Sequence, residues 1–96
     1  DVLSALAQNI PQLVGGSADL AASNNSYLKG FADFAAELKG VPRNVHWGIR
    51  EHAMGSAANG MALHGGVLPY VATFLIFSDY MRPAIRLACL MNLPVR

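Results

Sequence analysis

Residues 45–53 read Val-His-Trp-Gly-Ile-Arg-Glu-His-Ala, and the fold of the chain can be inferred outward from them. Residues 44–49 have strand character, and a run of small and apolar residues of helical length follows at 51–64. Glu51 therefore falls where a buried strand gives way to a helix, the edge at which open α/β sheets bind ligands. From its position alone, Glu51 is either a ligand-binding carboxylate or a first-turn acid that complements the helix dipole.

The composition is apolar for so short a chain. Of the 96 residues, 53% are hydrophobic and 14% are charged. Small domains normally expose much of their surface, so this balance predicts a piece of a larger core. We therefore expect residues 1–96 to form part of one domain, with residues 93–96 beginning a further strand.

Charge and residue spacing argue against several partners. A net charge of +1 without basic clusters does not predict a nucleic-acid partner. The longest apolar run, residues 67–77, is too short to cross a bilayer, so no membrane partner is predicted. Cys89 has no second cysteine to pair with, and we expect it to be a small buried hydrophobe. His52 and His64 have no ligand-like partner at metal spacing, so no metal site is predicted within the chain.

Strand and helix patterns alternate along the chain. We expect strands over residues 12–16, 44–49 and 67–73, and helices over residues 2–9, 31–39, 51–64 and 74–92, the last kinked or split at Pro83. Residues 21–30 read as a polar loop that can wall a cleft. This alternation predicts a parallel α/β sheet with helices on both faces.

Several residues in this frame have two interpretations. Gly15-Gly16 suits either close approach to a ligand or a turn with positive φ. Gly55 and Gly60 each cost a helix about 1 kcal/mol relative to alanine, which predicts that another backbone packs closely on a buried helix. Phe74, Phe77 and Tyr80 recur at three-residue spacing, as either a core stripe or the wall of a ligand cleft.

Three blocks of the sequence resemble the pyrimidine-binding domain of the transketolase family. They are Gly-Gly-Ser-Ala-Asp-Leu at 15–20, Gly-Ile-Arg-Glu-His-Ala-Met-Gly at 48–55, and Ala-Thr-Phe at 72–74 with Phe-Ser-Asp-Tyr-Met-Arg-Pro-Ala-Ile-Arg at 77–86. They follow the family's order and spacing over essentially the whole chain. The resemblance implies a thiamin diphosphate-binding fold, of which this chain holds an incomplete pyrimidine-binding domain.

The resemblance also implies an activity. Transketolases reversibly transfer a two-carbon ketol group from a ketose phosphate to an aldose phosphate through a thiamin diphosphate ylide, in the pentose phosphate pathway. It implies a divalent metal, magnesium or calcium, held by a domain outside this chain. It further implies sugar phosphate substrates, a homodimer with the site at the subunit interface, and a cytoplasmic location.

Individual positions match the family's functional residues. By this resemblance, Glu51 is the catalytic glutamate that hydrogen-bonds the aminopyrimidine ring, and Asp19 is an acid near the thiazolium ring. Ser23 matches a residue that touches the substrate phosphate. The aromatic side chains packed around the aminopyrimidine are matched by Phe74, Phe77 and Tyr80.

The match has gaps. Ala22 stands where many members carry proline, and the arginine that partners Ser23 on the phosphate would fall before Asp1. The Gly-Asp-Gly motif of the diphosphate- and metal-binding domain is absent from the sequence. We therefore expect residues 1–96 to supply half of a site and to be inactive alone.

Two other classes of protein remain as alternatives. A 1-deoxyxylulose-5-phosphate synthase or the β subunit of a 2-oxo acid dehydrogenase also places a glutamate against the pyrimidine. The block containing Asp19 and the block at residues 80–86 favour transketolase over both. A non-catalytic α/β module that binds a small molecule or a partner is the alternative outside this superfamily.

Overall fold

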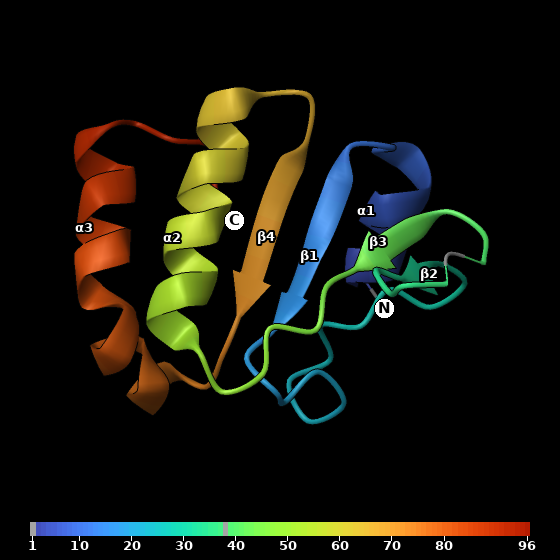
Figure 1. Ribbon diagram of the computed structural model, residues 1–96, viewed down its shortest axis with the longest axis horizontal. Coiled ribbons are helices and arrows are strands. Elements are labelled where there is room, and N and C mark those ends of the chain that lie inside the picture. The colour runs from blue at the N-terminus through green and yellow to red at the C-terminus, as the bar shows by residue number, and fades with distance from the viewer. Residues whose placement is uncertain (1, 38) are drawn as a thin grey trace.

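A parallel sheet forms the centre of the computed structural model, which describes residues 2–37 and 39–96. Within those residues the sheet has four strands in the order β2-β3-β1-β4 (Figure 1). The bounds are Leu13–Ser17 for β1, Ala32–Asp33 for β2, Pro42–Asn44 for β3 and Leu68–Ala72 for β4. Every pairing is parallel, which confirms the sheet type predicted from the sequence.

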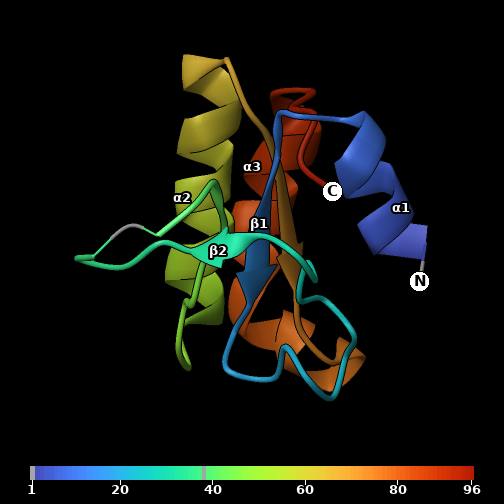
Figure 2. The same cartoon turned by 90° about the vertical axis from the view of Figure 1, so that its right-hand side faces the viewer.

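Helices cover both faces of this sheet (Figure 2). On one face lies α1 (Val2–Asn9), whose Ala7 packs with Leu13 and Tyr70. On the other lies α2 (Glu51–His64), whose Met54 belongs to a second apolar cluster that Val71 joins from β4. Neighbouring residues of a strand point to opposite faces, so Tyr70 and Val71 serve different cores. The predicted α/β fold with helices on both faces is confirmed.

After β4 the chain forms a 3₁₀ helix, η1 (Leu75–Met81), and then α3 (Arg82–Leu90), which packs beside α2. Pro83 lies in the first turn of α3, where its missing N–H costs nothing. Residues 74–92 are therefore split into two helices next to Pro83, which was one of the two predictions from the sequence. Arg96 then donates its N–H to the Pro69 carbonyl and accepts from the Val71 N–H, at 3.0 and 2.8 Å. This parallel bonding beside β4 agrees with an extended segment at residues 93–96.

The central strand β1 is buried throughout and contains both glycines of the Gly15-Gly16 pair. A Cβ on Gly15 would overlap the Tyr70 carbonyl, and one on Gly16 would overlap the Val45 carbonyl. Neither glycine has a positive φ, so the turn interpretation was wrong. The pair instead lets neighbouring backbones approach β1 on both sides.

The helix expected over residues 31–39 is absent from the described part of that range. Ala32–Asp33 forms β2, with the Ala32 N–H donating to the Val41 carbonyl at 3.0 Å and the Phe34 N–H to the Asn44 carbonyl at 2.9 Å. Leu38, which completed the expected apolar stripe, lies outside the described residues. Pairing with β3 satisfies backbone groups that a helix would have bonded locally, so tertiary context overrides the apolar spacing.

The strand expected at 44–49 was also placed too late in the chain. β3 ends at Asn44, and residues 45–50 form an irregular connection to α2. Only the Val45 N–H continues the ladder among these residues, donating to the Gly15 carbonyl at 2.7 Å. Glu51 still begins α2 as expected, but a six-residue connection rather than a strand leads into it.

Two buried polar side chains on β3 hold the loops around the sheet. The Asn44 amide accepts from the Leu28 N–H at 2.8 Å and donates to the Leu28 and Phe31 carbonyls, each at 3.0 Å. Arg43 donates to the Ala7 carbonyl, at the end of α1, at 2.6 Å. These bonds fix the loop at 21–31 and the end of α1 to the same strand.

Candidate functional site

The residues expected to form a site largely converge on one pocket. A pocket of about 820 Å³ opens where β1 ends, beside the start of α2 and η1. Its wall includes Asp19, Glu51, Phe77 and Tyr80, which come from three separate segments of the chain. These lie at the carboxyl end of the sheet, where parallel α/β folds bind ligands.

Glu51 is the first residue of α2, and only 8% of its surface is exposed. None of the described residues donates a hydrogen bond to its carboxylate or forms an ion pair with it. A carboxylate at this position complements the helix dipole, and its oxygens are not among the buried side-chain atoms that lack a partner, so they reach the surface of the pocket. The arrangement therefore leaves the Glu51 carboxyl group available to a ligand in the pocket.

The aromatic residues form one side of the pocket. The Phe77 and Tyr80 rings stack with their centroids 6.4 Å apart and their planes 22° apart, and both residues line the pocket. Tyr80 is nevertheless 67% exposed, and Phe74 lies outside the pocket wall just before η1. In this chain alone these rings do not close the pocket against water.

Asp19 occupies the turn that follows β1. Its φ of 66° lies in the left-handed region, which aspartate tolerates better than most residues, and its N–H donates to the Ser17 carbonyl at 3.0 Å. The Ala18 N–H meanwhile continues the ladder to the Ala72 carbonyl at 3.1 Å. The turn thereby brings Asp19 to the pocket wall as soon as the strand ends.

Ser23 lies apart from this pocket. It is exposed in a turn of the loop at 21–30, where its N–H donates to the Leu20 carbonyl at 3.0 Å. The loop is tied to the sheet because Asn24 donates to the Ser17 hydroxyl at 2.7 Å and Tyr70 donates to the Ser26 carbonyl at 2.8 Å. The phosphate role of Ser23 stays a prediction.

The residue-by-residue prediction missed Arg50, which lies beside Glu51 on the pocket wall. Its guanidinium folds back over Gly48 and donates to the Trp47 carbonyl at 3.0 Å. Gly48 has a φ of 66°, and a Cβ there would collide with the guanidinium. The Gly-Ile-Arg-Glu run could have indicated this role of Arg50, because a glycine at position 48 leaves room for the Arg50 guanidinium to fold back over it.

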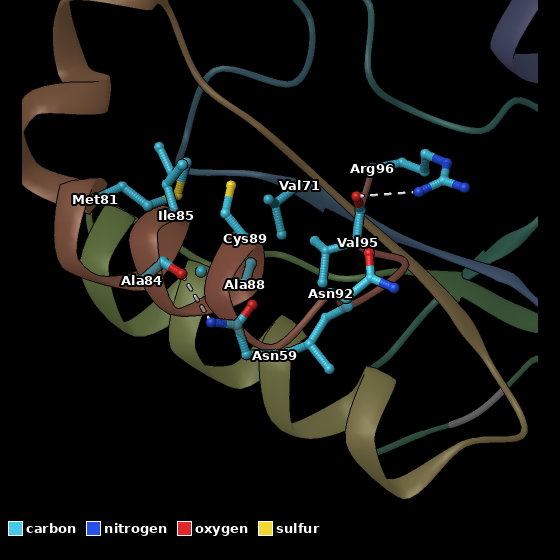
Figure 3. A pocket seen from close by; sticks show the side chains of 12 residues that line it. Asn59, Val71, Met81, Ala84, Ile85, Ala88, Cys89, Asn92, Val95 and Arg96 are labelled. Atoms are coloured by element: carbon cyan, nitrogen blue, oxygen red, sulfur yellow. Dashed lines mark hydrogen bonds between the residues drawn. The ribbon is translucent and has the colours of Figure 1, made fainter.

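A second pocket lies between α2, α3 and the segment at 92–96, with a volume of about 430 Å³ (Figure 3). Cys89 projects from α3 into it and is exposed, so the expectation that this cysteine is buried was wrong. The side chain lies on the face of α3 that borders this pocket, where the described residues leave it uncovered. None of the predicted site residues lines this pocket.

Among residues 2–37 and 39–96, no group of three or more histidine, cysteine, aspartate or glutamate side chains is placed to hold a metal ion. In the same described residues, no helix has both the length and the apolar character that crossing a bilayer requires.

The fold and the site define a class of protein: a parallel α/β domain that presents a carboxyl group and stacked aromatic rings to a small molecule at the carboxyl edge of its sheet. Comparison with known proteins narrows this class. The family model for the transketolase pyrimidine-binding domain matches residues 1–96. The chain belongs to this family.

Curated relatives agree with the family match. The transketolase of Aquifex aeolicus is 61% identical over 94 residues, covering 98% of this chain and 14% of the relative. The transketolase of Bacillus subtilis is 57% identical over 96 residues, covering 99% of this chain and 14% of the relative. The chain thus spans about one seventh of the length of these relatives.

Solved structures share the fold. Transketolase from Campylobacter jejuni superposes with a TM-score of 0.89 at 45% identity, over 98% of this chain and 14% of that one. A Pichia stipitis transketolase in complex with sedoheptulose-7-phosphate gives 0.89 at 40% identity, over 98% of this chain and 15% of that one. Among the alternatives raised from the sequence, these matches favour transketolase.

Proposed function

We propose that this chain is the pyrimidine-binding part of a transketolase, an enzyme that moves a two-carbon ketol group from a ketose phosphate to an aldose phosphate. The observation that carries the proposal is the Glu51 carboxyl group, nearly buried at the pocket wall and free of any partner among the described residues. A sugar phosphate substrate is supported by the Pichia stipitis relative, which was solved with sedoheptulose-7-phosphate.

The residues present fit the aminopyrimidine of thiamin diphosphate, the cofactor that the transketolase family implies. An aromatic ring packs favourably against other aromatic rings, and Phe77 and Tyr80 both line the pocket. The ring nitrogens require a polar partner, and Glu51 lines the same pocket. When bound, thiamin diphosphate supplies the nucleophilic carbon that takes up the ketol group.

Glu51 acts in this proposal as an acid. Its carboxyl group shares a proton with a ring nitrogen of the aminopyrimidine, which favours the form in which the ring's amino substituent can act as a base. Phe77 and Tyr80 orient the ring, and contact of Phe74 with the ring stays a prediction from the family resemblance, because Phe74 lies outside the pocket wall. Asp19 places a negative charge on the pocket wall, where it can stabilise positive charge on the cofactor.

The rest of the site belongs to other parts of the enzyme. The η1 segment exposes Leu75 at 88% and Ile76 at 73%, beside the exposed ring of Tyr80. Such a patch suits burial against another protein surface, and we assign it to a second subunit of a homodimer. The diphosphate and a divalent metal, magnesium or calcium, are held by a domain outside residues 1–96. A cytoplasmic location in the pentose phosphate pathway belongs to the same proposal.

The test is ketol transfer by the full-length polypeptide that carries this segment. With a ketose phosphate donor, an aldose phosphate acceptor, thiamin diphosphate and magnesium, we expect turnover, and we expect none from residues 1–96 alone under the same conditions. Absence of transfer by the full-length protein would contradict the proposed activity. Turnover by residues 1–96 alone would contradict the division of the site.

A further inference from the structure

Asp33 joins two segments that the proposed mechanism does not use. It lies on the edge strand β2, and its two carboxylate oxygens have different partners. The Tyr27 hydroxyl donates to Oδ1 at 3.0 Å, and His46 Nε2 lies 3.2 Å from Oδ2. The Tyr27 and His46 rings also contact each other, with centroids 6.4 Å apart. One carboxylate thus links the loop at 21–31 to the connection at 45–50.

Those two segments line hollows that adjoin the candidate site. A hollow of about 470 Å³ lies between Tyr27, Lys29 and His46. His46 is also part of the wall of a second hollow, of about 240 Å³, which Asp19 and Arg50 border on its other side. Asp19 and Arg50 in turn line the pocket of Glu51. Shared wall residues therefore connect three hollows in sequence, from Glu51 outward to Tyr27.

We propose that Asp33 is a positioning residue, which sets the spacing of Tyr27 and His46 in the hollows that adjoin the Glu51 pocket and so the binding of the substrate there. The inference rests on the proposed transketolase function. Asp33 touches no reacting group, since it lies behind Tyr27 and His46 and outside the pocket walls. Its effect is therefore on substrate binding rather than on proton transfer at Glu51.

The positioning effect of Asp33 can be distinguished from a contribution to the stability of the fold. The His46 and Asp33 side chains are 59% and 41% exposed, and exposed ion pairs contribute little to stability. Their loss should leave the fold intact, because Asn44 still bonds Leu28 and Phe31, while Tyr27 loses its link to the connection at 45–50. Asp33 also raises the pKa of the Tyr27 hydroxyl, chiefly by accepting its hydrogen bond.

The experiment compares Asp33→Ala with Glu37→Gln in the full-length enzyme. Glu37 is an exposed acid four positions away, with no hydrogen bond or ion pair to any described residue, so it controls for lost charge. We expect Asp33→Ala to raise KM for the aldose phosphate acceptor about 3- to 10-fold with kcat changed less than about 2-fold, the pattern of lost binding. Glu37→Gln should match wild type in both.

A double-variant cycle sharpens the test. If the Tyr27 hydroxyl acts through Asp33, Tyr27→Phe should raise KM in the wild type and change nothing in the Asp33→Ala background. Additive effects, or an Asp33→Ala enzyme that matches Glu37→Gln, would overturn the positioning role while leaving the proposed function in place. Should Asp33→Ala fail to fold, Tyr27→Phe alone decides, because it removes a single hydroxyl. A wild-type enzyme without ketol transfer would overturn both proposals together.

Discussion

Gly55 of α2 faces Ala84 of α3 so closely that a Cβ on the glycine would lie 2.9 Å from the alanine Cβ and 2.8 Å from Met81 Cγ. The sequence suggested that a backbone packs against both helix glycines, and this was wrong in detail. Side chains pack on Gly55, and nothing lies within 4 Å of a Cβ at Gly60. Substitution of the two glycines by alanine should therefore change the stability of the domain in opposite directions.

Gly55→Ala should destabilise the domain by roughly 1–3 kcal/mol, because α3 must move away from α2 to admit a methyl group. Gly60→Ala should instead stabilise it by up to about 1 kcal/mol, since alanine favours the helix and the space is open. Chemical denaturation of both variants measures the difference. Equal effects of either sign would show that the contact with Ala84 does not constrain the helix pair.

Glu51→Gln keeps the size of the side chain and its capacity to hydrogen-bond but removes the acid. In the full-length enzyme we expect kcat to fall by roughly 10²- to 10⁴-fold, the range typical of a positioned acid or base. Cofactor affinity should fall less, since the diphosphate is held elsewhere. Hydrogen exchange at C2 of the bound cofactor measures the step directly. An exchange rate equal to wild type would leave Glu51 with only its role at the helix N-terminus.

Ser23→Ala tests the phosphate role that the family resemblance implies. Ser23 is exposed on a loop outside the pocket, so its loss should leave the chemistry at Glu51 unchanged. We expect KM to rise for phosphorylated acceptors more than kcat falls, with no change for an unphosphorylated aldehyde. If both kinds of acceptor are affected alike, Ser23 does not bind phosphate.

Asn44→Ala should be among the most destabilising polar substitutions in the chain. The buried amide makes three hydrogen bonds, and its loss removes the partner of the Leu28 N–H and of the Phe31 carbonyl, while the Leu28 carbonyl keeps only the Phe31 N–H at 3.4 Å. We expect a loss of about 2–4 kcal/mol in the free energy of unfolding. Asn9→Ala is the control, because Asn9 is exposed and bonds only within α1. Its effect should stay within about 0.5 kcal/mol.

Alkaline pH should weaken the domain through Tyr70. Burial raises the pKa of this hydroxyl from 10.0 to about 12. Between these values the unfolded chain releases a proton that the folded chain keeps, so the free energy of unfolding falls as pH rises from about 10 to 12. Tyr70→Phe should flatten this decline, at the cost of the bond to the Ser26 carbonyl. Tyr80→Phe, at an exposed ring, should leave the decline in place.

The local sequence pattern was sufficient to predict the bounds of some helices. The bounds of α1 and α2 agree with the expected ones, because a proline follows the first and paired glycines follow the second. Asp19, Glu51, Phe77 and Tyr80 were also expected at one site and line one pocket. Glu51 begins α2 and Asp19 lies two residues after β1, at boundaries that the sequence marks clearly, whereas Phe77 and Tyr80 lie within η1.

Other features depend on partners far along the chain. The apolar spacing at 31–39 fits a helix, but pairing with β3 makes Ala32–Asp33 a strand. Asn44 looks like an ordinary strand residue until its bonds to Leu28 and Phe31 are seen. Asp33 belongs to no recognisable motif, because the positioning role proposed for it depends on its contacts with Tyr27 and His46. Such contacts cannot be predicted from the residues that neighbour each position in the sequence.

The position of β1 has a consequence for how the protein is made. This strand is buried along its whole length, yet both of its sheet partners, β3 and β4, come later in the sequence. During synthesis on a ribosome, Leu13–Ser17 therefore emerges with unpaired backbone groups and waits for most of the segment to follow. The pocket cannot assemble until η1 has emerged, because Phe77 and Tyr80 form its last wall. A nascent chain stalled before β4 should therefore expose β1 with one edge unpaired and bind chaperones.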